Sequence, residues 1–169
     1  MDTRLKTALW QQYGAAIDTL TDAINLCPAS LWTAVVYKDE EDERHGQFWF
    51  VAYHAVFWVN LFLEGADHAA FQPPAPFIRG RLPDAPYTKE DVRRYLDHGR
   101  QKAQATIEAL TDESASRICK FNWMEPTFFE LMMYTMRHLM EHAAELTLRL
   151  GEHDVTGMDW IAKARETAS

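Results

Sequence analysis

Hydrophobic residues recur along the chain at the three- and four-residue spacing of amphipathic α-helices. We expect four long helices, at about residues 3–25, 47–64, 88–110 and 127–150. Thr88 and Thr127 each stand three positions before an acidic residue, a typical helix-capping pattern. Gly65 and Gly151 stand where the second and fourth helices should end. No segment alternates with period two, so no sheet is expected.

A short fifth helix is expected at about 158–167, where Trp160, Ile161 and Ala164 would form a docking edge. Four helices of this length predict an all-α four-helix bundle, formed as one domain over residues 1–169. The connections are long. Residues 66–87 can reach up to ~70 Å, against a helix length of ~30 Å, so the second and third helices could be parallel.

Composition narrows the class of protein. With 17 basic and 25 acidic residues, the net charge of −8 argues against nucleic-acid binding, which needs clustered cations. The longest apolar run, 48–63, is shorter than the ~20 residues that span a bilayer, and it contains His54 and Asn60. The two cysteines form no CxxC motif, and the N-terminus does not look like a signal peptide. We therefore expect a cytoplasmic protein with no membrane partner.

Two histidines interrupt the apolar stripe of the fourth helix. His138 and His142 are four positions apart, so their rings emerge on one helix face and could bind one metal ion. His54 lies in the otherwise apolar middle of the second helix and could supply a third ligand. An unpartnered imidazole there would cost about 1–3 kcal/mol. The alternatives are a core histidine bonded to a hydroxyl or carbonyl group, and a solvent-facing pair.

Other metal architectures fit less well. No helix contains the Glu-x-x-His motif of di-iron bundles, and the chain has neither HExxH nor CxxCH. The remaining histidines are expected on the surface: His45, His68, His98 and His153.

Three segments carry a resemblance to a known family. "RHLMEHAAELTLRL" (137–150) is similar to the last helix of the DinB/YfiT-like family, and "AYHAVFWVNLFLEG" (52–65) resembles its second helix. Residues 87–110 are similar to its third helix. The resemblance implies an up-down-down-up bundle with a three-histidine divalent metal site. The implied ligands are His54, His138 and His142.

Family members of known chemistry are thiol-dependent transferases, isomerases or hydrolases, in which the metal activates a thiol or water. The resemblance thus implies a metal-dependent enzyme acting on a small-molecule substrate, with a thiol as one candidate. Three protein ligands would leave a position open, as in catalytic zinc sites. All-imidazole ligation favours nickel or zinc. The alternative is a non-catalytic, stress-related binding or oligomeric bundle whose metal site is structural or vestigial.

Two residues depart from the family pattern. Glu141 stands where a further histidine is common, and Glu145 where glutamine is common. Neither change removes a ligand. Glu145, one turn from His142, could orient that ring, act as a catalytic base, or form an exposed salt bridge.

The second helix also predicts an interface. Its face opposite His54 carries only apolar residues: Trp49, Ala52, Val56, Val59 and Leu63. Either the long connections, such as proline-rich residues 71–77, cover this face, or a second subunit does. The second alternative predicts a homodimer through this helix.

Overall fold

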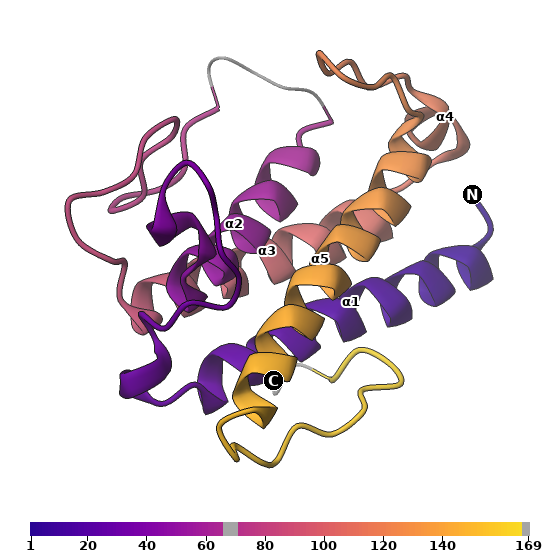
Figure 1. The fold of residues 1–169 in the computed structure, drawn as a ribbon. Helices are drawn as coiled ribbons and strands as arrows, with labels where there is room; N and C mark the ends of the chain where they lie inside the picture. The colour runs from indigo at the N-terminus through magenta and orange to yellow at the C-terminus, as the bar shows by residue number, and fades with distance from the viewer. Residues whose placement is uncertain (66–70, 167–169) are drawn as a thin grey trace.

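The computed structural model describes residues 1–65 and 71–166, which form helices and loops without a sheet (Figure 1). Two isolated bridges are the only extended pairing within these residues. The four predicted long helices are confirmed. They are α1 (Thr3–Leu26), α2 (Phe48–Phe62), α3 (Lys89–Glu108) and α5 (Phe128–Gly151), joined by the short α4 (Asp112–Ser116) and the 3₁₀ turns η1 (Ala29–Leu31) and η2 (Glu43–Gly46).

The predicted caps set the helix starts. The Thr88 hydroxyl accepts a hydrogen bond from the Asp91 amide at 3.1 Å, and Thr127 accepts one from the Glu130 amide at 3.2 Å. These bonds satisfy amides that have no partner inside the helix. After α2, Gly65 has a φ of +76°, a left-handed conformation that favours glycine.

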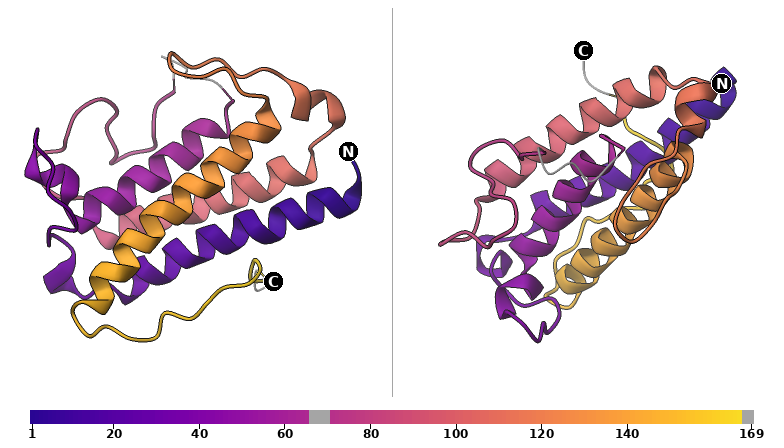
Figure 2. Two further views of the ribbon diagram at one scale, coloured as in Figure 1. Left: turned by 45° about the vertical axis from the view of Figure 1, so that its right-hand side comes forward. Right: turned by 90° about the horizontal axis from the view of Figure 1, so that it is seen from above.

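The helices form a ring in which α1 packs on α5 and α3, and α2 packs on the same two helices (Figure 2). α2 and α3 are parallel. Tyr53, early in α2, contacts Tyr87 just before α3, while Lys102, late in α3, bonds to the Asn60 carbonyl late in α2. The long connection between α2 and α3 returns to the starting end of α2, as the up-down-down-up order requires. No described helix is both long and apolar enough to cross a bilayer.

The apolar face of α2 opposite His54 is buried within one chain. All five residues are at most 7% exposed: Trp49, Ala52, Val56, Val59 and Leu63. The connection covers part of this side: Phe77 stacks on Tyr53 and Tyr95, with ring centroids 5.3 and 4.8 Å apart. Covering by the connection, one of the two predicted alternatives, is what the structure shows. α2 also packs on α3 and α5 within the chain, and the homodimer through this helix stays a prediction.

The predicted C-terminal helix is wrong over its described residues, 158–166, which are not helical. The backbone there bonds to α1 instead. The Ala164 amide donates to the Gln11 carbonyl at 2.8 Å, and the Arg165 amide donates to Asp18 Oδ2 at 2.7 Å. Tertiary hydrogen bonds have replaced the helical ones. We call residues 155–166 the C-terminal strap.

One of the three residues predicted to dock does so fully. Ala164 is 7% exposed and lies against Gly14, where a side chain on α1 would collide with it. Ile161 is partly buried, whereas Trp160 is 86% exposed.

Candidate metal centre

The seam between α2 and α5 brings together the three histidines singled out in the sequence. His138 Nε2 lies 3.3 Å from His54 Nε2 and 3.1 Å from His142 Nε2. One nitrogen from each ring lies within 4.8 Å of the other two. The i,i+4 spacing on α5 and the packing of α5 on α2 produce this convergence, as the pattern predicted.

The nitrogen separations fit a shared metal ion. A tetrahedral zinc ion holds imidazole nitrogens at about 2.0–2.1 Å, which places two such nitrogens about 3.3–3.4 Å apart. The two measured distances are within about 0.3 Å of this separation.

Hydrogen bonding alone does not account for the cluster. Each neutral imidazole nitrogen offers either one N–H or one lone pair, in a single direction in the ring plane. His138 Nε2 therefore cannot point at both neighbours at once. His138 Nδ1 is buried and has no hydrogen-bond partner among the described residues. A cation between the three rings would satisfy all three Nε2 lone pairs.

Burial keeps two of the rings neutral. The pKa of His54 is lowered from 6.5 to about 3. Burial away from water is the main cause, and charge repulsion from the neighbouring His142 and His138 adds to it. The pKa of His138 is lowered to about 4, mainly by burial and to a smaller extent by charge repulsion from His142. Both rings therefore offer a lone pair at neutral pH, which metal binding requires.

Glu145 holds the third ring. Its Oε2 lies 2.8 Å from His142 Nδ1, and the two side chains are 35% and 13% exposed. When Nδ1–H donates to this carboxylate, the lone pair of His142 is on Nε2, directed at the other histidines. The carboxylate sits on the ring edge away from Nε2. This contact favours the orienting role for Glu145 over that of a base.

Comparison with known proteins agrees with the fold. A model of the DinB superfamily matches residues 9–146. The chain belongs to the DinB superfamily. A crystal structure of a DinB-like protein, YjoA from Bacillus subtilis, is 17% identical over 91% of this chain and 96% of that chain, with a TM-score of 0.61. At this identity the likeness shows the fold alone. No curated protein matches the chain.

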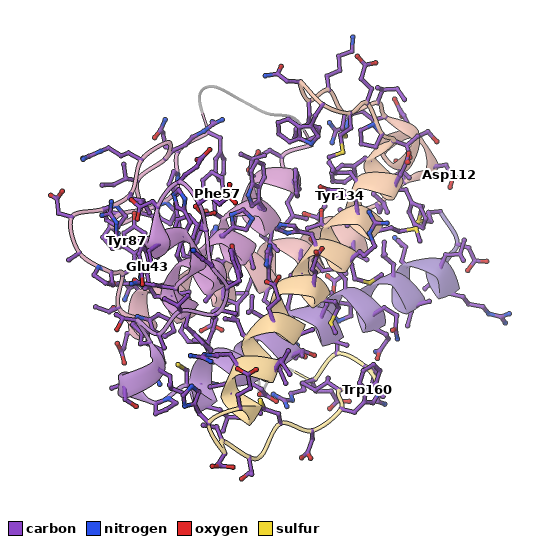
Figure 3. All side chains as sticks on the ribbon, viewed as in Figure 1. Glu43, Phe57, Tyr87, Asp112, Tyr134 and Trp160 are labelled. Carbon is purple, nitrogen blue, oxygen red and sulfur yellow. The ribbon has the colours of Figure 1, made fainter. Side chains whose placement is uncertain are left out.

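A cavity of about 280 Å³ in this DinB domain is lined by His54. Its walls are mainly aromatic residues of α2, among them Phe50, Phe57 and Trp58, and its far side is formed by residues 78–82 of the connection. Phe57 and the nearby Tyr87 are labelled in Figure 3. A small molecule in this cavity would therefore reach the edge of the histidine cluster. Another groove, of about 610 Å³, lies between α1 and α5 and is lined by none of the three histidines.

Sequence reasoning missed one residue of the cavity. His45 was expected on the surface, but it is partly buried and lines the same cavity as His54. Its Nδ1 lies 3.4 Å from Asp39 Oδ1, which also accepts from the Glu41 and Asp42 amides. No periodic pattern marks this pair, because both residues lie outside the long helices.

Of the other three histidines expected on the surface, the two in the described part of the chain are confirmed there. His98 and His153 are exposed. His68 lies outside the described residues.

Proposed function

We propose that this DinB superfamily protein is a metal-dependent enzyme, of the thiol-dependent transferase or hydrolase type. Its divalent ion, nickel or zinc, would be held by His54, His138 and His142. The observation that supports the proposal is the convergence of three Nε2 atoms at metal-like separations beside a cavity. When bound, such an ion lowers the pKa of a coordinated water or thiol and polarises the substrate.

The protein's own residues would prepare the site in three ways. Burial keeps His54 and His138 unprotonated and so available as ligands. Glu145 fixes the tautomer and orientation of His142. Phe57 and Trp58 line the cavity and exclude water from around the substrate.

The ligand chemistry limits the metal and the partner. Three imidazoles suit nickel or zinc, whereas calcium and magnesium prefer oxygen ligands. A cavity of about 280 Å³ accepts only a small molecule, and a small thiol is the substrate class that we propose. The net charge of −8 supports neither a nucleic acid nor an anionic membrane as a partner. We keep a cytoplasmic location as an expectation.

The test begins with metal analysis of protein purified without a histidine tag. We expect one divalent ion per chain, lost when His138 is replaced by Ala and retained when the exposed His98 is replaced by Ala. Cobalt-substituted protein should then change its visible spectrum when a small thiol is added, because three protein ligands leave a position open. A cobalt spectrum that responds to no added thiol or anion would support the non-catalytic alternative, in which the site is structural.

A further inference from the structure

A second groove lies on the side of α5 that carries its methionines. It runs between α1 and α5, with a volume of about 610 Å³. Ala15 and Ala16 contribute the α1 side, and Met133, Met136 and Met140 form the α5 wall. Small residues on one helix leave room that flexible methionine side chains can adapt to fill. The groove is therefore suited to receive a bulky apolar side chain.

Trp160 stands at the rim of this groove. It is 86% exposed, the highest value among the exposed large hydrophobic residues, and it projects from the C-terminal strap (Figure 3). The strap is anchored just beyond it. Gln12 Nε2 donates to the Ala162 carbonyl at 3.3 Å, and the Ala164 amide donates to α1 at 2.8 Å. The indole is thus held out into solvent from a fixed backbone.

Three charged residues line the groove with Trp160: Glu130, Arg137 and Asp159. Arg137 lies on α5, and Asp159 directly precedes Trp160 on the strap. Both side chains are exposed, and neither forms an ion pair or a side-chain hydrogen bond within residues 1–65 and 71–166. The guanidinium of Arg137 lies 5.6 Å from the centroid of the Tyr134 ring, with which it forms a cation–π contact. The patch therefore carries one cation, Arg137, and two anions, Glu130 and Asp159, and Asp159 also interacts electrostatically with Arg165 of the strap.

We infer that this patch joins two copies of the chain in a two-fold dimer. Trp160 of each copy enters the groove of the other, and Asp159 beside it meets the partner's Arg137. The patch carries both partners of each contact. Trp160 protrudes beside a groove that could receive an indole, and the anion Asp159 lies on the same surface as the cation Arg137. Self-complementarity of this kind is what a two-fold interface requires.

The interface would be strong for its size because of its central residues. Tryptophan and arginine are the side chains most enriched among residues that dominate binding energy. Trp160 enters from an anchored strap, so little conformational entropy is lost when it docks. The inference does not depend on the proposed function, because none of the candidate metal ligands lines the groove.

Sedimentation velocity over a micromolar concentration range tests the inference. We expect a wild-type dimer, and a dissociation constant raised on the order of 30-fold or more by Trp160→Ala. Trp123→Ala is the matched control, since Trp123 is also exposed (53%) but does not line the groove. A wild-type monomer throughout the range, or a Trp160→Ala dimer as tight as wild type, would overturn the inference. Circular dichroism confirms that each variant is folded.

Charge exchange tests the register of the dimer. Arg137→Glu and Asp159→Arg should each weaken the dimer several-fold, because each places like charges opposite one another. The double variant restores opposite charges and should recover most of the wild-type affinity. A double variant no tighter than either single variant would overturn the pairing of Arg137 with the partner's Asp159.

Discussion

Two seams of the bundle bury polar side chains, and they differ in whether those side chains find partners. Between α1, α3 and the strap, Asp18 is 4% exposed. Its carboxylate accepts from Arg100 Nε at 2.8 Å, from Arg100 Nη2 at 3.3 Å and from the Arg165 amide at 2.7 Å. Both oxygens of the Asp18 carboxylate therefore have partners within the chain.

The seam between α2 and α5 is different. Its three Nε2 atoms crowd together, and His138 Nδ1 has no hydrogen-bond partner among the described residues. Buried polar groups are normally paired, so a group left without a partner calls for an explanation. The Asp18 carboxylate is fully paired within the chain, whereas the histidine seam brings together three ring nitrogens that could hold a metal ion. That contrast makes the second seam the functional candidate.

The largest expected effect is on metal binding. Replacing His54, His138 or His142 singly by Ala should abolish stoichiometric uptake of zinc or nickel, because two imidazoles hold a divalent ion weakly. Isothermal titration calorimetry measures this, with Asp18→Ala as the comparison from the other seam. Uptake that survives each single replacement would mean that the three rings do not act as one site.

The next effect is on stability, and it belongs to the Asp18 seam. Asp18→Ala leaves Arg100 without its carboxylate partner and frees the strap, which should cost about 3–5 kcal/mol in urea denaturation. The control is Asp22→Ala, which removes the more exposed pair with Arg165 and should cost less than about 1 kcal/mol. Equal costs for the two variants would show that the pairing of Asp18 stabilises the fold no more than the exposed pair does.

A third expectation concerns pH in metal-free protein. The folded-state pKa values of His54 (about 3) and His138 (about 4) lie below the unfolded value of 6.5. The unfolded chain therefore binds protons first as the pH falls, and stability drops from about pH 6.5 downward. The loss should reach about 2 kcal/mol per histidine by pH 5. His54→Gln should remove the contribution of His54 to this loss of stability. If the stability of the variant falls with pH as steeply as that of the wild type, His54 is not buried in its neutral form.

The smallest expected effect comes from the residue that orients a ligand. Glu145→Gln replaces the carboxylate that accepts from His142 Nδ1 and should weaken zinc binding about 10-fold. Glu141→Gln is the control, because Glu141 is exposed and lies on the same helix. Folding stability should be nearly unchanged in both. A Glu145→Gln protein that binds zinc as tightly as the control would leave Glu145 with no part in the site.

Much of the fold and the cluster followed from periodicity. The spacing of apolar residues predicted α1, α2, α3 and α5, because each helix buries one continuous stripe. The same stripes located His54 at mid-α2 and the His138–His142 pair on α5. Two facing stripes with imidazoles at similar heights must bring those rings together once the helices pack.

Other features depend on contacts that no local pattern records. The strap is not helical because its amides bond to α1, as the Ala164 amide does to the Gln11 carbonyl. His45 joins the cavity because loop residues fold back onto α2. The apolar side of α2 is buried because α3, α5 and residues 71–87 pack around the helix. In each case a distant part of the chain decided the outcome.

The order of the ligands along the chain has a consequence for biosynthesis. His54 and His138 are 84 residues apart in sequence, and the second of them lies on the last long helix. During translation, α2 and α3 leave the ribosome well before α5 exists. Until α5 docks, the nascent chain has one imidazole at this position, which cannot hold an ion. Under the proposed function, metal loading therefore has to follow the synthesis and docking of α5.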